Sequence, residues 1–329
     1  MNLVTGATGF VGAAVARALL ARGEAVRLLA RPGSERTNLE GLDAEVVSGD
    51  LADPSTFAAA VAGCRRVYHV AALYKLWDRD SSVFYRVNVD GTVALLRAAA
   101  DAGASRIVYT STVGAVGIPG DGRPGDEGTP LALESVHGHY KRSKFLAEKE
   151  VLRLAGEGVP VVIVNPSAPM GPRDVKPTPT GKIVVDFALG KMPAYLDTGL
   201  NIVHVDDVAE GHLLAAERGR IGERYVLGNE NLTLREILQM LSGIVGRPAP
   251  RVRMPYWVAY GASLASHAAA AVLRSEPAIP LDAVRMARKK MFFDPSKAVR
   301  ELGLTLRPAR EALADAYRWF VDHGYVPHA

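Results

Sequence analysis

Tyr140 and Lys144 are the residues whose types and spacing most clearly suggest chemistry. They stand four positions apart in a stretch, 140–155, whose composition predicts a helix, so both side chains would lie on one helix face. A tyrosine hydroxyl has an ordinary pKa of about 10, and a neighbouring ammonium group stabilises the phenolate and lowers that pKa. Such a tyrosine can exchange a proton with a substrate hydroxyl or carbonyl group. The pair alone is common on solvent-facing helices.

Hydroxyl groups upstream of this pair strengthen the prediction. The run Arg106–Ser111 predicts a strand, and Thr110, Ser111 and Thr112 stand at its end. Ligands of open α/β sheets bind at the carboxyl ends of the strands, where a hydroxyl group can hydrogen-bond a substrate oxygen and stabilise developing charge. Each of the three could instead be an ordinary strand-end cap.

A glycine-rich turn at the start of the chain predicts a dinucleotide site. It follows a predicted strand, Asn2–Thr5, and opens a predicted helix, Val11–Ala21. In this context the first glycine permits the tight turn, the second lets the backbone approach a pyrophosphate, and the third lets helix and strand pack closely. The N–H groups at the helix N-terminus would face the phosphates. The predicted contacts are Gly6, Thr8, Gly9, Phe10, Val11 and Gly12.

The end of the second predicted strand indicates which dinucleotide binds. An NAD site usually places an acidic residue there, against the ribose 2′-hydroxyl. This chain has Arg31 at that point, with Ser34 and Arg36 close behind. A guanidinium group can hold a 2′-phosphate in a bidentate manner. We therefore expect NADP(H) to be preferred, with NAD(H) as the alternative because Glu35 lies among these residues.

Residues after three other predicted strands, together with Tyr140 and Lys144 on their helix, complete the expected cofactor contacts. Asp50 could reach the adenine, although it could equally cap the next helix. Small residues after the fourth strand suit a backbone that passes beneath a cofactor. The full additional set is Asp50, Leu51, Ala71, Ala72, Tyr140, Lys144, Pro166 and Ala168.

The order of predicted elements indicates the fold. Short β-branched runs alternate with alanine-rich stretches, a pattern typical of parallel sheets with crossover helices. The predicted strands are Asn2–Thr5, Ala25–Ala30, Ala44–Ser48, Val67–Val70, Arg106–Ser111 and Val159–Asn165, and the helices include Val11–Ala21, Pro54–Ala62, Asp90–Ala102 and Tyr140–Ala155. We expect an α/β fold with a Rossmann-type doubly wound parallel sheet at 1–168, to which 200–228 return. Residues 169–199 and 229–329 would form a smaller C-terminal substrate lobe, with a helix over Asn231–Gly243 that Thr233 and Glu236 begin as a capping box.

Composition narrows the class of protein. The 329 residues carry a net charge of +4 and a single cysteine, Cys64, so no intrachain disulfide forms. Neither a nucleic-acid partner nor a transmembrane span is expected, and no signal peptide precedes the glycine turn. The apolar stretch Tyr256–Leu273 suits a buried or interface helix, with a membrane-surface helix as the alternative. We expect a cytoplasmic protein, peripheral membrane association being the alternative, and no metal at His204, Asp206 and Asp207.

These motifs, in this order, resemble the extended short-chain dehydrogenase/reductase family. The later segments around Asn165–Asp174 and Asn201–Ala209 resemble its hopanoid-associated sugar epimerase branch, which is similar to dihydroflavonol 4-reductase and cinnamoyl-CoA reductase. The resemblance implies Tyr140 as the acid/base, Lys144 as the partner that also holds the nicotinamide ribose, and Thr112 as the family's Ser/Thr. Asn88 matches a family asparagine of the active site, although it could simply cap a helix. Relatives often form homodimers.

Three functions fit the sequence. The first is an NADP(H)-dependent carbonyl reductase like dihydroflavonol 4-reductase, in hopanoid lipid metabolism if the branch resemblance extends that far. The second is an NAD-dependent sugar-nucleotide epimerase or dehydratase, with diphosphate-binding cations among Arg173, Lys176, Lys182 and Lys191. The third is a dinucleotide-sensing protein without catalysis. The small-molecule substrate, a carbonyl compound, sugar or lipid-linked sugar, would contact Tyr74, Trp77, Thr112, Met170 and Tyr195.

Overall fold

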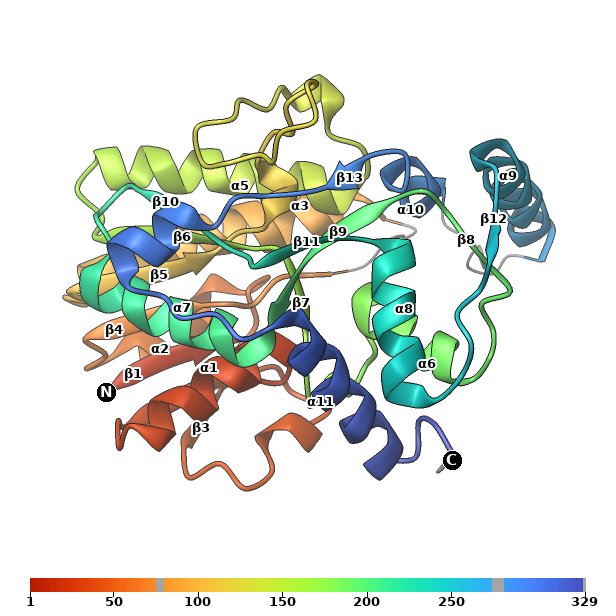
Figure 1. Ribbon diagram of the computed structural model, residues 1–329. Helices are drawn as coiled ribbons and strands as arrows, with labels where there is room; N and C mark the ends of the chain where they lie inside the picture. Colours follow the sequence, from red (N-terminus) through yellow and green to blue (C-terminus); the bar gives the residue numbers. More distant parts are fainter. Residues whose placement is uncertain (75–79, 274–280, 328–329) are drawn as a thin grey trace.

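A parallel seven-stranded sheet forms the centre of the molecule (Figure 1). The computed structural model describes residues 1–74, 80–273 and 281–327. The strand order is β10-β6-β5-β4-β1-β2-β3, which is the doubly wound arrangement, so the expected fold class is confirmed. The strands are β1 (Asn2–Thr5), β2 (Val26–Ala30), β3 (Glu45–Ser48), β4 (Arg66–His69), β5 (Arg106–Thr110), β6 (Val161–Pro166) and β10 (Arg224–Leu227).

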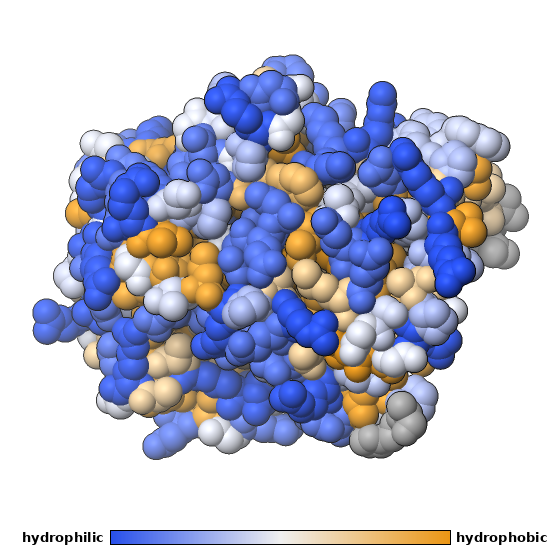
Figure 2. Space-filling model, in the orientation of Figure 1, coloured by the Kyte–Doolittle hydropathy of each residue, from blue (hydrophilic) through white to orange (hydrophobic). Residues whose placement is uncertain are grey.

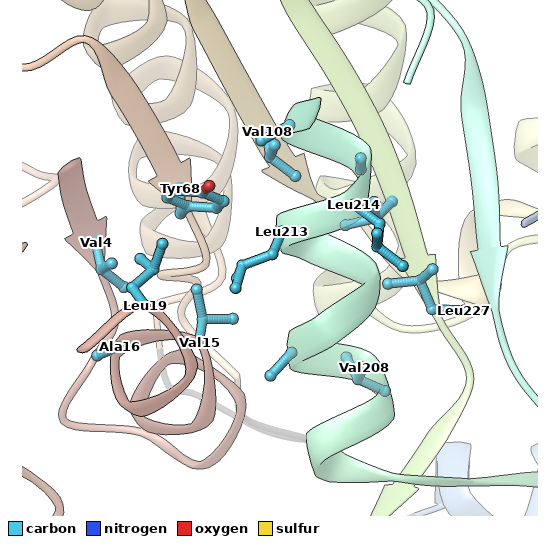
Figure 3. Packing of buried hydrophobic residues seen from close by; sticks show 14 of the residues in the cluster. Val4, Val15, Ala16, Leu19, Tyr68, Val108, Val208, Leu213, Leu214 and Leu227 are labelled. Carbon is cyan, nitrogen blue, oxygen red and sulfur yellow. The ribbon is translucent and has the colours of Figure 1, made fainter. Parts of the chain in front are cut away.

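Helices cover both faces of this sheet because successive strand residues point to opposite sides. Val4 and Val108 pack with α1 (Phe10–Ala21) and α7 (Val205–Arg218) in one cluster of buried side chains. Figure 3 shows Leu213 of α7 directed toward Val15 of α1. The other face packs against helices α2 (Phe57–Val61), α4 (Gly91–Asp101) and α5 (His139–Gly156).

A second, smaller sheet lies beside the first. In it β9 (Gly199–His204) pairs with β7 (Ala168–Met170), β11 (Glu230–Thr233) and β13 (Lys290–Met291). Three helices bury an apolar cluster against it: α6 (Pro179–Ala188), α8 (Leu234–Val245) and α11 (Ala309–Asp322). The segment 200–228 is divided between the two sheets. Helix α7 packs against the large sheet and β10 is one of its strands, whereas β9 belongs to the small sheet. The division of the chain into two lobes stays a prediction.

The predicted helix over Asn231–Gly243 is correct only in part. Residues 230–233 form β11, which pairs antiparallel with β9, and α8 begins after them. Thr233 accepts a hydrogen bond from Glu236 N, and the Glu236 carboxylate accepts from Thr233 N, so the predicted capping box is confirmed. The first residues of the predicted helix are extended because they pair with β9, a strand distant in the sequence. Local propensity does not contain information about this pairing.

The exterior is mostly polar in the view of Figure 2, where hydrophobic groups form separate small patches. A further pair of short strands, β8 (Ala194–Tyr195) and β12 (Val252–Arg253), leads into α9 (Tyr256–Leu273) at the edge of the molecule (Figure 1). Within the described ranges, α9 included, the structure contains no helix that is both long enough and apolar enough to cross a membrane.

Candidate active site

The glycine turn after β1 is shaped by close backbone contacts. Gly6 has φ 76°, a conformation that favours glycine, and a Cβ atom there would lie 2.7 Å from the Ala71 backbone nitrogen. A Cβ on Gly12 would collide with the carbonyl oxygen of Gly6. The turn closes with a hydrogen bond from Gly9 N to Gly6 O, 2.9 Å long. Side chains at Gly6 and Gly12 would therefore push the turn out of this shape.

The start of α1 fits the pyrophosphate of a dinucleotide. Gly9 precedes the helix without a side-chain cap, and the first turn contains no acidic residue. Helix-start N–H groups without partners inside the helix are ready donors to phosphate oxygens. The turn also lies where strand order reverses, since β1 has β2 on one side and β4 on the other. Ligands of doubly wound sheets bind at this point.

The residues expected to determine whether NADP(H) or NAD(H) binds lie on one loop after β2. Ser34 N donates to Arg31 O over 3.2 Å, which closes a turn, and Arg31 and Arg36 are exposed. Glu35, the residue that argued for NAD, forms an ion pair with Lys176 at 3.1 Å between Nζ and Oε2. Its charge is thus partly neutralised by a segment far away in the sequence.

Asp50 does not cap the helix that follows β3. Asp53 does so instead, because its Oδ1 accepts from Ser55 N over 3.1 Å. The Asp50 carboxylate accepts from Ala52 N over 2.9 Å and is half-buried beside the buried Leu51. Asp53 therefore fills the capping role that was the alternative to adenine binding for Asp50.

Lys144 lies beneath the end of the sheet, on α5. Its side chain is 2% exposed, and Nζ donates to Tyr109 Oη over 2.9 Å and to Thr110 O over 2.6 Å. Both acceptors belong to β5, which fixes the ammonium group at that strand's carboxyl end. Burial lowers the pKa of Lys144 to about 7, and the nearby Glu148 carboxylate acts in the opposite direction.

Tyr140 differs from the sequence-based expectation in its pKa. An adjacent ammonium group was expected to lower it, but burial, followed by the neighbouring Tyr74, raises the Tyr140 pKa well above its ordinary value. The Tyr74 ring packs edge-on against the Tyr140 ring with centroids 4.7 Å apart. The two Lys144 hydrogen bonds go to β5 rather than to Tyr140, so the phenolate has no cation bonded to it. The Tyr140 hydroxyl group is therefore neutral at neutral pH and still carries the proton that it could donate.

The three hydroxyl groups after β5 have different surroundings. Thr110 is buried and its hydroxyl bonds His212 Nε2 over 2.8 Å. Ser111 is also buried, and within the described ranges its hydroxyl has no hydrogen-bond partner. Thr112 is half-buried, and its Oγ1 accepts from Gly114 N over 3.1 Å. Thr112 is thus the most accessible of the three, and its hydroxyl group, which is the acceptor in this bond, can also act as a donor.

A buried polar network, which the sequence did not reveal, fixes Thr112. Asn165 Nδ2 donates to Thr112 O over 3.0 Å and to Glu148 Oε2 over 2.7 Å. The other Glu148 oxygen accepts from Arg224 over 3.0 Å. The network joins the residue Thr112 after β5 to β6, α5 and β10, and it fixes the Glu148 carboxylate, whose charge acts on Lys144. A polar asparagine inside the otherwise apolar strand Val161–Pro166 was the available signal.

Asn88 ties the loop after β4 to α5. It is 1% exposed, its Oδ1 accepts from Leu73 N over 2.7 Å, and its Nδ2 donates to Leu73 O and to Ser143 Oγ. It lies inside a helical turn, Arg86–Asp90, where it caps nothing. Asn88 is thus a positioning residue for the helix that carries Tyr140 and for the loop that carries Tyr74.

Replacing Asn88 with alanine should destabilise the protein by roughly 1–3 kcal/mol, since buried groups lose their partners. Urea denaturation measures this change. Asn88→Asp keeps the acceptor for Leu73 N but buries a carboxylate against Leu73 O, so a loss at least as large is expected. Equal stability of Asn88→Ala and the wild type would contradict the positioning role.

The expected substrate contacts are only partly brought together. Tyr74 is 48% exposed beside Tyr140. Met170 is 1% exposed inside the core of the lobe, so it has no open surface to offer. Tyr195 is half-buried and packs on the same cluster. Trp77 lies outside the described residues.

Pro166 and Ala168, the other expected cofactor contacts, are buried at the end of β6 and the start of β7. Ala71 and Ala72 are half-buried after β4, where Ala71 N donates to Thr5 Oγ1 over 3.1 Å. These segments follow strands β4 and β6 at the same edge of the sheet as the glycine turn.

Comparison with known proteins decides the family. The model of the NAD dependent epimerase/dehydratase family matches residues 2–228. The chain belongs to this family. It is an NAD(P)-dependent short-chain dehydrogenase/reductase of the extended type, as the motifs indicated.

Several epimerase/dehydratase family relatives match over nearly the whole chain. A Synechocystis sp. protein named "Putative dihydroflavonol 4-reductase" is 47% identical and covers 98% of this chain and 95% of its own. Sterol demethylase protein B of Methylococcus capsulatus is 38% identical, with 99% of each chain covered. The 4-hydroxy-2-methyl-3-oxo-4-farnesyl-3,4-dihydroquinoline-1-oxide ketoreductase of Stigmatella aurantiaca is 34% identical, again over 99% of each.

Solved structures agree with this family assignment. The crystal structure of gox2253 has a TM-score of 0.89 at 51% identity, with 99% of each chain covered. The dTDP-glucose 4,6-dehydratase DesIV of Streptomyces venezuelae, with NAD and TYD bound, has a TM-score of 0.76 at 26% identity, covering 99% of this chain and 98% of its own. The family binds a nicotinamide dinucleotide, which the glycine turn and the open start of α1 fit.

Proposed function

We propose that this family member is an NADP(H)-dependent reductase of carbonyl compounds. The observation that carries the proposal is the loop after β2, which presents Arg31, Ser34 and Arg36 and no acid at the strand end. Glu35 is already paired with Lys176. Exposed cations at this position suit a 2′-phosphate and would be idle beside a ribose hydroxyl group.

The side chains at the sheet edge supply the proton and the orientation. When bound, the nicotinamide supplies or accepts the hydride. Thr112 would donate a hydrogen bond to the substrate carbonyl oxygen, and Tyr140, neutral and half-buried, would donate the proton that this oxygen needs on reduction. The Lys144 ammonium group, which donates to Tyr109 and Thr110 on β5, would stabilise the resulting Tyr140 phenolate by its charge rather than by a hydrogen bond, and would hold the nicotinamide ribose.

An apolar, ring-containing ketone is the substrate class that we favour. Tyr74 presents an aromatic surface next to Tyr140, and apolar walls with few polar groups are typical of small-molecule sites. Two relatives carry names that refer to a sterol and to a farnesylated ring ketone. A role in hopanoid lipid metabolism is consistent with such a substrate.

The second candidate is an NAD-dependent sugar-nucleotide epimerase or dehydratase, which the family name supports. It would need cations for the substrate diphosphate. Two of the expected cations have other partners, because Lys176 pairs with Glu35 and Lys182 pairs with Asp186. This occupancy favours the reductase. A sensor without catalysis would not need the full set of Thr112, Tyr140 and Lys144, which this chain has.

Replacing Arg31 with alanine should raise the Kd for NADPH by about 10- to 100-fold, the value of a lost charge-assisted contact of about 1.5–3 kcal/mol. The Kd for NADH should change by less than about twofold. Fluorescence titration of both nucleotides measures the difference. Arg123→Ala, an exposed arginine paired with Asp121, is the matched control. Tighter binding of NADH than of NADPH to the wild type would contradict the proposed preference.

A further inference from the structure

Arg173 has a backbone conformation that disfavours its side chain. Its φ is 73°, and it is the only non-glycine residue with positive φ among those described. The left-handed region costs an ordinary residue about 1–2 kcal/mol. A glycine would adopt it without this strain. The chain therefore keeps a guanidinium group at a place where the backbone alone favours glycine.

The segment that carries Arg173 is held firmly. The next residue, Asp174, is 2% exposed, and its Oδ2 accepts from Thr178 N over 2.8 Å and from Thr178 Oγ1 over 2.7 Å. These bonds close the loop between β7 and α6 directly after Arg173. The loop therefore fixes the backbone position from which the half-buried Arg173 side chain extends.

A second arginine lies nearby without a counter-charge. The Arg17 guanidinium donates to two neutral carbonyl oxygens, Asn38 O at 3.1 Å and Glu40 O at 3.0 Å. Burial, and after it the positive charge of Arg173, lowers the pKa of Arg17. In the described part of the chain, neither arginine forms an ion pair with a carboxylate. Two guanidinium groups whose charges act on each other and that form no ion pair among the described residues make a place for an anion.

Two contacts relate these arginines to the predicted dinucleotide site, one near Arg17 and one near Arg173. Asn38, which Arg17 contacts through its carbonyl oxygen, donates from Nδ2 to Thr8 O of the glycine turn over 3.3 Å. Three residues after Arg173, Lys176 pairs with Glu35 on the loop after β2. The segment that carries Arg173 thus contacts, through Lys176, the loop that carries Arg31.

We propose that Arg173 binds a phosphate group of the dinucleotide, with Arg17 beside it. The proposal rests on the proposed function only in taking the ligand to be a nicotinamide dinucleotide. Its phosphates, the pyrophosphate and the 2′-phosphate, share the anionic oxygens that a guanidinium group holds in bidentate fashion. The strained backbone is then tolerated because it aims a cation at that anion.

The test compares Arg173→Gly with the wild type in nucleotide binding and in thermal stability. We expect a Kd at least about tenfold higher for NADPH, the loss of one charge-assisted contact. We also expect a Tm that does not fall, since glycine relieves the positive φ. Arg173→Lys, which keeps a charge without the bidentate geometry, should lie between the two. Lys182→Met removes a cation from the neighbouring helix and serves as the control.

NADPH and NADH distinguish the two phosphates. A loss confined to NADPH would assign Arg173 to the 2′-phosphate, and an equal loss for both nucleotides would assign it to the pyrophosphate. Unchanged affinity for both, or a loss of affinity that accompanies a lower Tm, would overturn the proposal. Stronger binding of NADH by the wild type would contradict only the NADP(H) preference, since Arg173 is still tested by NADH.

Discussion

Replacing Tyr140 with phenylalanine should lower kcat for carbonyl reduction by about 10²- to 10⁴-fold, the range for removal of a positioned proton donor. The Kd for NADPH should stay within about twofold of the wild type, since the ring and its packing against Tyr74 are kept. The substrate oxygen would have to take its proton from a poorly placed donor.

Steady-state rates and fluorescence titration measure these two effects of Tyr140→Phe. Tyr85→Phe is the matched control, because the Tyr85 hydroxyl bonds His139 over 3.0 Å next to Tyr140 without being assigned a proton-transfer role. Unchanged turnover of Tyr140→Phe would rule out Tyr140 as the acid. A fall of similar size in Tyr85→Phe would show a general loss of local structure instead.

The ionisation of Lys144 should control how the reductase responds to pH. Its pKa in the free protein is lowered to about 7, and kcat/KM for NADPH reports ionisations of the free enzyme. In the proposed mechanism the charge of the Lys144 ammonium form stabilises the Tyr140 phenolate. We therefore expect kcat/KM for NADPH to fall roughly tenfold per pH unit above this pKa.

Two variants test whether the ionisation of Lys144 causes this fall in kcat/KM. Lys144→Met should lose about 10²-fold or more in kcat, and Lys144→Arg, which stays charged, should retain residual activity without the fall near neutral pH. An unchanged pH profile in Lys144→Arg would assign the ionisation to another group.

Unfolding at high pH would not explain such a profile. The unfolded chain returns Lys144 to its ordinary pKa of 10.5, whereas the folded value is about 7. Between these values the unfolded state binds more protons, so the contribution of Lys144 to the free energy of unfolding rises with pH. Between pH 7 and pH 10.5, kcat/KM for NADPH should therefore fall while the contribution of Lys144 to the free energy of unfolding rises.

The large sheet was predictable because parallel strands buried on both faces are runs of β-branched and other apolar residues. All six predicted strands exist, with ends within two residues of β1 to β6. The start of the lobe was harder to predict. Residues 230–233 pair with β9, about thirty positions earlier in the chain, and helical periodicity around them contains no information about that pairing.

The candidate site shows the same limit at the level of side chains. Spacing predicts that Tyr140 and Lys144 share a helix face, but not that the ammonium group turns to Tyr109 and Thr110 on β5. The link from Thr112 through Asn165 to Glu148 joins three separate elements. The pairing of Glu35 with Lys176 crosses from one predicted lobe to the other. Each depends on tertiary placement.

Transfer of a labelled hydride tests the proposed reaction most directly. The protein is incubated with NADPH that carries deuterium at the transferable C4 position and with a panel of apolar ring ketones. We expect one deuterium atom at the new carbinol carbon of the reduced product, together with stoichiometric oxidation of NADPH. A protein that retains bound NAD, leaves added NADPH unoxidised and inverts a sugar-nucleotide centre without net redox change would contradict the proposal.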